Sequence, residues 1–291
     1  MKKMLALLLA LVMVLSLAAC ASSQPAATDA AASTETAETT ETTEPAAEES
    51  AEAPAESGKT YTVGVCQLVQ HEALDAATQG FVDALKEELG DAVTVDVQNA
   101  SGDSVNCGTI VNGFVSKGVD LIMANATPAL TAAVSATADI PILGTSITAY
   151  GVALDIDDFN GTVGGNVSGT SDLADLQAQA QMILDWFPET KTVGLLFCSA
   201  EPNSRYQIDE VRKALEAQGV TCEEFAFTDS NDVSSVTQKA ADFSDVVYIP
   251  TDNTAASNTE AIANVLIPAG VPAICGEEGL CRGCGVATLS I

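Results

Sequence analysis

The sequence predicts an α/β protein with two parallel sheets, each flanked by helices. Short β-branched and apolar segments alternate with segments of helical periodicity, which is the pattern of strand, helix and strand units. The apolar strands indicate sheets that are covered on both faces. The alternation runs twice, so we place one lobe at 59–165 and a second at 166–291, although no repeat is visible residue by residue.

The predicted strands are short segments bounded by Gly, Pro, Asn or Asp. They lie at 60–65, 93–98, 121–125, 141–144, 192–198, 221–227, 246–250, 272–275 and 286–290. The segment between the two series of strands and helices, 157–172, is polar and rich in glycine. This composition predicts a crossover and hinge between the lobes rather than a regular helix or strand.

The predicted helices carry apolar side chains three or four residues apart. Three such stripes run through 74–89, 173–187 and 208–215, and Trp186 and Phe187 at the end of the second are expected in the core. Helix starts are expected at four capping residues, and a helix end before Gly219. The four are Asp103, Ser204, Asp232 and Asp252.

The N-terminus has the layout of a bacterial lipoprotein signal peptide. Lys2 and Lys3 precede an apolar stretch that is too short for a membrane span, and Leu17-Ala18-Ala19-Cys20 resembles a lipobox. We therefore expect 1–20 to be a signal peptide and Cys20 to be acylated, with palmitate among the acyl chains. Residues 21–58 contain mainly Ala, Thr, Ser, Glu and Pro, which predicts a disordered acidic tether.

Composition excludes several function classes. The chain has 40 acidic and 11 basic residues, a net charge of −29, so no basic surface is available for nucleic acid or an anionic membrane. Neither a Gly-x-Ser-x-Gly elbow, a phosphate-binding loop nor a His-Glu-x-x-His helix occurs. We therefore expect a protein that is not an enzyme and that uses neither a cofactor nor a metal.

The loops after the strands are the expected ligand site, because ligands of open parallel sheets bind beyond the carboxyl ends of the strands. These loops are rich in hydroxyl, amide and carboxylate side chains, and several open helices whose N–H groups favour a carboxylate. Acids such as Asp252, Glu277 or Glu278 would hold an ammonium group. The competing interpretation is that these residues are helix caps and nothing more.

Several stretches, in order along 60–291, resemble the substrate-binding lipoproteins of ABC importers, in the group that includes tryptophan- and tyrosine-type binding proteins. They are Gln67-Leu68-Val69-Gln70-His71-Glu72-Ala73-Leu74-Asp75, Asn99-Ala100-Ser101-Gly102-Asp103, Ala126-Thr127-Pro128-Ala129, Gly164-Gly165-Asn166-Val167-Ser168-Gly169-Thr170-Ser171-Asp172, Pro250-Thr251-Asp252-Asn253-Thr254 and Ala287-Thr288-Leu289-Ser290-Ile291.

The resemblance implies a two-lobed type I periplasmic-binding-protein fold that closes on one small solute, often an amino acid and sometimes an aromatic one. It implies a monomer, anchored by lipid on the extracytoplasmic face of the cell membrane, that delivers the solute to an ABC permease driven by an ATPase. A surface receptor or sensor of the same fold, signalling to a partner, stays open as an alternative. The binding residues implied are Gln67, His71, Thr127, Ser146, Ser171, Asp172, Asn203, Ser204, Asp252 and Glu277.

Family members continue beyond the position of Ile291 with a segment that returns to the first lobe. We therefore expect the return segment to be absent and the C-terminus of the second lobe to be incomplete, either because the sequence is a fragment of a longer protein or because the first lobe lacks its closing helix. The seven cysteines after Cys20 leave three interpretations open: free or buried thiols, a structural disulfide, or a metal or redox role for Cys281-Arg282-Gly283-Cys284. The seven are Cys66, Cys107, Cys198, Cys222, Cys275, Cys281 and Cys284.

Overall fold

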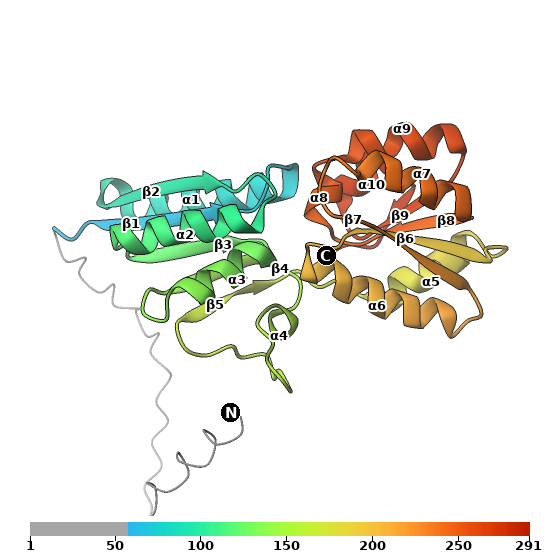
Figure 1. Ribbon diagram of the computed structural model, residues 1–291. Coiled ribbons are helices and arrows are strands. Elements are labelled where there is room, and N and C mark those ends of the chain that lie inside the picture. Colours follow the sequence, from blue (N-terminus) through green and yellow to red (C-terminus); the bar gives the residue numbers. More distant parts are fainter. Residues whose placement is uncertain (1–57) are drawn as a thin grey trace, which may run out of the picture. The chain divides into compact units, whose positions relative to one another are not determined.

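The computed structural model describes residues 58–291, which contain two parallel five-stranded sheets (Figure 1). The predictions for 1–57, namely the signal peptide, the lipobox at Cys20 and nearly all of the tether, lie outside the described residues. Among the helices of the described part, none is both long and apolar enough to cross a membrane. We call 58–172 the first lobe and 173–291 the second lobe.

The first sheet has the strand order β2-β1-β3-β4-β5, and all of its pairs are parallel. Its strands are short, and the central ones are apolar and buried, as the sequence predicts. They are β1 (Tyr61–Gln67), β2 (Val93–Asn99), β3 (Leu121–Asn125), β4 (Ile142–Ile147) and β5 (Val167–Ser171).

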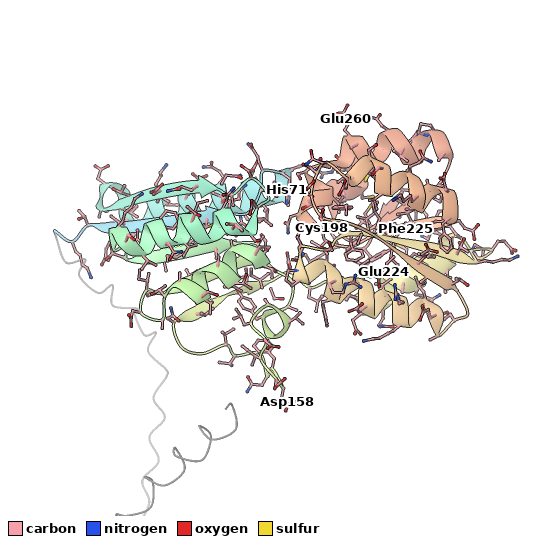
Figure 2. The ribbon with its side chains drawn as sticks, in the orientation of Figure 1. His71, Asp158, Cys198, Glu224, Phe225 and Glu260 are labelled. Atoms are coloured by element: carbon pink, nitrogen blue, oxygen red, sulfur yellow. The ribbon has the colours of Figure 1, made fainter. Side chains whose placement is uncertain are left out.

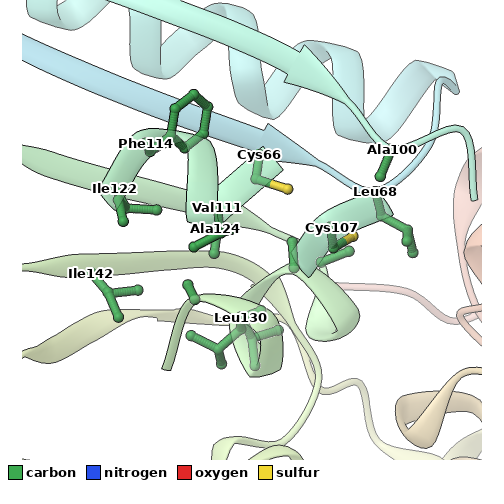
Figure 3. Packing of buried hydrophobic residues seen from close by; sticks show 14 of the residues in the cluster. Cys66, Leu68, Ala100, Cys107, Val111, Phe114, Ile122, Ala124, Leu130 and Ile142 are labelled. Carbon is green, nitrogen blue, oxygen red and sulfur yellow. The ribbon is translucent and has the colours of Figure 1, made fainter. Parts of the chain in front are cut away.

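Helices cover both faces of this sheet. α1 (Glu72–Leu89) packs on one face, over the small cluster around Val63, Val65 and Met123. α2 (Ser104–Lys117) and α3 (Thr127–Ala136) pack side by side on the other face. The larger core lies beneath them, where Phe114, Leu130, Ile122 and Ile142 interlock (Figure 3). The short elements η1 (Gly90–Ala92) and α4 (Tyr150–Ala153) complete this lobe.

The second sheet repeats this order as β7-β6-β8-β9-β10, again with parallel pairs. The repeated strand order means that the lobes share one topology, although their sequences differ. The strands are β6 (Thr192–Cys198), β7 (Thr221–Phe227), β8 (Val246–Ile249), β9 (Ala273–Cys275) and β10 (Ala287–Thr288).

Two helix layers enclose the second sheet. α5 (Leu176–Trp186) and α6 (Pro202–Glu216) cover one face. α7 (Val233–Phe243), α9 (Thr259–Ala269) and α10 (Glu278–Cys284) cover the other, and α8 (Asn253–Ala256) is a single turn after β8. Each layer buries its own apolar cluster against the sheet, so the sheet lies between two cores.

The expected crossover at 157–172 is partly wrong, because Val167–Ser171 forms β5 at the edge of the first sheet. This moves the boundary between the lobes from 165/166 to a position after β5. The strand is polar and mostly exposed, so it carries no apolar pattern. Gly169 is required there, because a Cβ would lie 2.0 Å from the Gly144 carbonyl oxygen of β4.

The capping predictions have mixed outcomes. Asp103 and Asp252 cap α2 and α8 through side-chain hydrogen bonds, whereas Asp232 precedes α7 without one. Ser204 is wrong as a helix start, because α6 begins at Pro202. Trp186 is also wrong as a core residue: it is 58 % exposed, since it lies where α5 ends and the apolar stripe leaves the sheet.

Candidate functional site

A cavity of about 220 Å³ lies at the carboxyl ends of the strands and is lined from both lobes. The first lobe contributes His71, Ser146 and Asp172, and the second contributes residues of the loops after β8 and β9. Both sets follow strands of parallel sheets, which is where such sheets place their ligands. The second-lobe polar lining residues are Thr251, Asp252, Asn253, Glu277, Glu278 and, after β10, Ser290.

Several residues of the first lobe hold unusual backbone conformations at this edge. Ser101 after β2, Ala126 after β3 and Ser146 in β4 have φ values of 57°, 85° and 56°, a region that side chains other than glycine rarely occupy. Ser146 lies where the register of β4 against β5 shifts. Such strain collects at functional sites, where the surrounding structure holds it in place.

Asp172 is the most distinctive group of the cavity. Its backbone N–H donates to the Ile147 carbonyl at 3.1 Å, which fixes the residue beside the end of β4. The Oδ1 atom is buried without a hydrogen-bond partner in the described protein. Burial raises the pKa of Asp172, and a hydrogen bond from Thr148 only partly opposes that shift. A buried, unpartnered carboxylate oxygen beside a cavity is the arrangement that a cationic ligand group would satisfy.

His71 contacts the opposite lobe. It lies at the start of α1, on the side that faces the second lobe (Figure 2), and its Nε2 is 3.2 Å from Asn253 Oδ1. Nearby, Arg282 of α10 bonds Glu72 of α1 at 2.9 Å. These contacts connect the N-terminus of α1 to the loops that follow β8 and β9.

Two buried acids, Asp252 and Glu201, hold the loops on the second-lobe side of the cavity by accepting hydrogen bonds from backbone N–H groups. Asp252 accepts hydrogen bonds from the N–H groups of Cys198 at 2.6 Å and Ala255 at 2.7 Å. Glu201, 2 % exposed, accepts from Asn253 and Thr254 through their backbone and side-chain donors. Burial, with the neighbouring Glu201 charge, raises the pKa of Asp252 to about 7.

These bonds give Asp252 and Glu277 structural roles as helix caps. Asp252 lines the cavity, but its two oxygens already accept backbone donors. Glu277 likewise caps α10 by accepting from Gly279 at 2.7 Å and from Leu280. The capping interpretation therefore describes both acids, and it leaves Asp172 as the unpartnered acid of the cavity.

Half of the predicted binding residues line the cavity and half lie behind it. His71, Ser146, Asp172, Asp252 and Glu277 line it. The other five support the loops or lie in the lobes. Gln67 donates a hydrogen bond to Asp75 and accepts one from Thr78, and Ser171 donates to the Thr148 carbonyl. Thr127 is buried, and its hydroxyl has no hydrogen-bond partner in the described protein. Asn203 and Ser204 are buried beside Glu201.

Sequence reasoning missed Glu201 and Asn253. Both lie in segments that were predicted to face the site. The sequence therefore predicted where these residues lie, but not that Glu201 would accept hydrogen bonds from Asn253. Glu201 precedes Pro202 at the start of α6, where an acidic side chain is normally read as a helix cap. Instead its carboxylate turns toward the N-terminus of α8.

No disulfide forms among the cysteines of the described residues, whose seven thiols are all free. Within that same part of the chain, no group of three or more His, Cys, Asp or Glu side chains is arranged to hold a metal ion.

Comparisons with known proteins agree with this geometry. The tyrosine-binding protein of Clostridioides difficile is 33 % identical to this chain over 230 residues. The matched region is 77 % of this chain and 66 % of the relative, so the chain spans slightly less than two thirds of that relative. An ABC domain from Streptococcus pneumonia in complex with L-Trp has a TM-score of 0.73 at 32 % identity, covering 78 % of this chain and 77 % of that one. A conserved domain protein from Vibrio cholerae also reaches 0.73 at 32 % identity, covering 77 % and 76 %.

A branched-chain amino acid transporter substrate binding protein from Streptococcus pneumoniae shares the fold alone, at 16 % identity and a TM-score of 0.52, over 77 % of this chain and 67 % of that one. The predicted two-lobed type I fold is confirmed, and the tyrosine and branched-chain amino acid relatives are named as binding proteins rather than as enzymes. Residues 62–291 match the family described as ABC transporter substrate binding protein, and the chain belongs to that family.

Proposed function

We propose that this protein captures a free amino acid between its two lobes and delivers it to an ABC permease on the extracytoplasmic face of the membrane. The observation that carries the proposal is the cavity lined from both lobes, with the unpartnered Asp172 oxygen beside it. In the family, a solute that contacts both lobes favours the closed form, which is a shift of population toward the state with more ligand contacts.

The chemistry of the lining suits an amino acid. Asp172 would accept hydrogen bonds from the ammonium group, and charge-assisted bonds of this kind are short and strong. The Ser146 hydroxyl and the His71 ring are available to the carboxylate. Leu74, Ala256 and neighbouring carbon atoms give the side chain an apolar wall. The relatives named for tyrosine and L-Trp make aromatic amino acids the first ligands to test.

A calorimetric titration tests the proposal. The full chain is titrated with each of the twenty amino acids, and at least one is expected to bind with a stoichiometry of one. Asp172→Asn should weaken that binding, whereas Asp139→Asn is the matched control because Asp139 is exposed and precedes β4 at the opposite edge of the sheet. If the wild-type protein binds no amino acid at millimolar concentration, the amino-acid assignment is wrong.

The membrane anchor is a separate part of the proposal. Acylation of Cys20 and the acidic segment after it would tether the binding domain to the membrane without spanning it. In the native host, the wild-type protein should sediment with membranes, and Cys20→Ser should move it to the soluble fraction. A Cys20→Ser protein that still sediments with membranes would argue against lipid anchoring.

A further inference from the structure

The second lobe contains two neighbouring cysteines that belong to one buried apolar cluster. Cys275 ends β9 and is fully buried, and Cys284 ends α10 and is 9 % exposed. The adjacent Cys284 thiol and burial raise the pKa of the Cys275 thiol well above its usual value, and the Cys284 thiol donates to the Leu280 carbonyl at 3.3 Å. Gly285 keeps the space between β9 and the end of α10 open, because a Cβ there would lie 2.5 Å from Cys275 Sγ.

Cys284, one member of this pair, borders the surface of the lobe. A surface hollow of about 550 Å³ is lined by Cys284 and by its neighbours on α10 and β9. Its other walls come from α9 and from the segments that flank β9, so it lies apart from the cavity at the carboxyl ends of the strands. A small external disulfide can therefore approach Cys284 while the lobe stays folded.

We propose that Cys275 and Cys284 are a site of reversible oxidation, at which a small external disulfide joins the two sulfurs. The Cys284 thiolate attacks the external disulfide, whose S–S bond breaks and releases one thiolate. The Cys275 thiolate then attacks Cys284 Sγ in the mixed disulfide and releases the second thiolate. Two cysteine thiols are oxidised, the external disulfide is reduced to two thiols, and these take the two protons.

Cys281 is a poorer partner for Cys284. It stands three residues before Cys284 on the same helix, where Cβ atoms are ~5–6 Å apart, whereas a disulfide needs ~3.5–4.5 Å. A catalytic Cys-x-x-Cys pair lies at a helix N-terminus, which favours the thiolate. Here neither cysteine lies at the N-terminus of α10, which begins at Glu278. The site is therefore one of modification rather than a reductase centre.

Oxidation would tie α10 to β9 across the loop that carries Gly276 and Glu277, which line the candidate site. A crosslink over a loop of this length restricts the unfolded chain, so the oxidised protein should melt ~4–8 °C above the reduced one. Addition of a reductant should reverse the shift.

Peptide mapping tests the proposal directly on the full chain. The folded protein is incubated with oxidised glutathione, its remaining thiols are blocked with N-ethylmaleimide, and it is digested with trypsin and a glutamyl endopeptidase. Cleavage after Arg282 and after Glu277 or Glu278 places Cys275, Cys281 and Cys284 on three separate peptides. A linked pair of peptides carrying Cys275 and Cys284 is expected. Cys284 linked to Cys281, or Cys275 and Cys284 both blocked by the maleimide, would overturn the proposal.

The chain offers its own controls. Cys281→Ser should keep the crosslink and Cys284→Ser should abolish it. Cys66 and Cys107 form a second pair of neighbouring thiols in the core of the first lobe, where both are fully buried (Figure 3). This pair should stay reduced while Cys275 and Cys284 react. Equal rates for both pairs would mean that reaction follows unfolding, which contradicts access through the hollow.

Discussion

At the scale of single residues, Asp172 and Asp252 differ in their hydrogen-bond partners, although both were predicted from the sequence as binding residues. Asp252 is saturated by backbone donors, whereas Asp172 keeps a buried oxygen without a partner. The difference depends on which way a loop turns its carboxylate, and local sequence does not encode that direction. The sequence therefore identifies the loops of the site but not the side chain within each loop that is free to bind.

Asp172→Asn should weaken binding of the amino acid by ~1.5–3 kcal/mol, because the amide replaces an anionic acceptor with a neutral one at a buried charge-assisted contact. This is about a tenfold to hundredfold increase in Kd by calorimetry. Asp252→Asn should have a smaller effect on Kd, since Asp252 acts through the loop. A larger loss for Asp252→Asn than for Asp172→Asn would reverse the roles assigned to the two acids.

Asp252 also makes stability depend on pH in an unusual direction. Because burial raises its pKa from 3.8 to about 7, the folded protein keeps a proton that the unfolded chain releases. The contribution of Asp252 to the free energy of unfolding is therefore greatest below about pH 4 and decreases by on the order of 2–4 kcal/mol as the pH rises to about 7.

Urea unfolding at several pH values measures this contribution. Asp252→Asn should make the decrease between pH 4 and pH 7 smaller, because the raised pKa of Asp172 contributes a decrease of the same sign. Only the slope is compared, because the amide also changes the hydrogen bonds. The control Asp139→Asn, at an exposed position, should keep the wild-type slope. Identical slopes for the wild type and Asp252→Asn would show that Asp252 is not titrating in this range.

At the scale of elements, most of the fold was predictable from the sequence. The strands 121–125, 192–198 and 221–227 coincide with β3, β6 and β7, because each is a continuous apolar or alternating run between clear boundaries. β5 was missed because an exposed edge strand needs no apolar residues. Its identity depends on hydrogen bonds to β4, which are distant in sequence.

The structure also reveals a repeat that was not visible in the sequence. Thr62-Val63-Gly64 of β1 and Thr192-Val193-Gly194 of β6 occupy the same place in their sheets. In each lobe an aspartate before the third strand accepts from the Thr backbone N–H, Asp120 at 2.7 Å and Asp245 at 2.9 Å. The matching residues are few and far apart, so only the shared topology brings them into register.

Glu201 organises the start of α8 and should be critical for that element. Glu201→Gln replaces one of two acceptor oxygens by a donor that faces the N–H groups of Asn253 and Thr254. We expect a loss of ~2–3 kcal/mol in the free energy of unfolding, measured by urea titration. Glu189→Gln, on an exposed turn, is the matched substitution and should change stability by less than ~0.5 kcal/mol. Equal effects would remove Glu201 from this role.

Two glycines of the first lobe should respond in opposite directions to the same change. A Cβ at Gly64 in β1 would lie 2.5 Å from the Phe114 ring, so Gly64→Ala should destabilise the lobe by ~1–3 kcal/mol. A Cβ at Gly80 in α1 would meet nothing within 4 Å, so Gly80→Ala should stabilise the helix by ~0.5–1 kcal/mol. Thermal melting distinguishes them, and a stabilising Gly64→Ala would contradict the described packing.

At the scale of the whole molecule, the central claim is that one amino acid binds between the lobes and contacts both. The site is divided between segments that are about a hundred residues apart in sequence, which is why it could be predicted as a set of loops but not as a set of contacts. The contact of His71 with Asn253 and the ion pair of Glu72 with Arg282 belong to the same boundary. The exposed ion pair is worth little by itself, so the ligand must supply most of the free energy that favours closure.

Amide hydrogen exchange with and without the bound amino acid tests this claim most directly. Exchange should slow on binding in both lobes, around Ser146 and Asp172 and around Asn253 and Glu277, with no comparable change at the opposite ends of the sheets. Protection confined to one lobe would contradict binding between the lobes, even if the affinity were high.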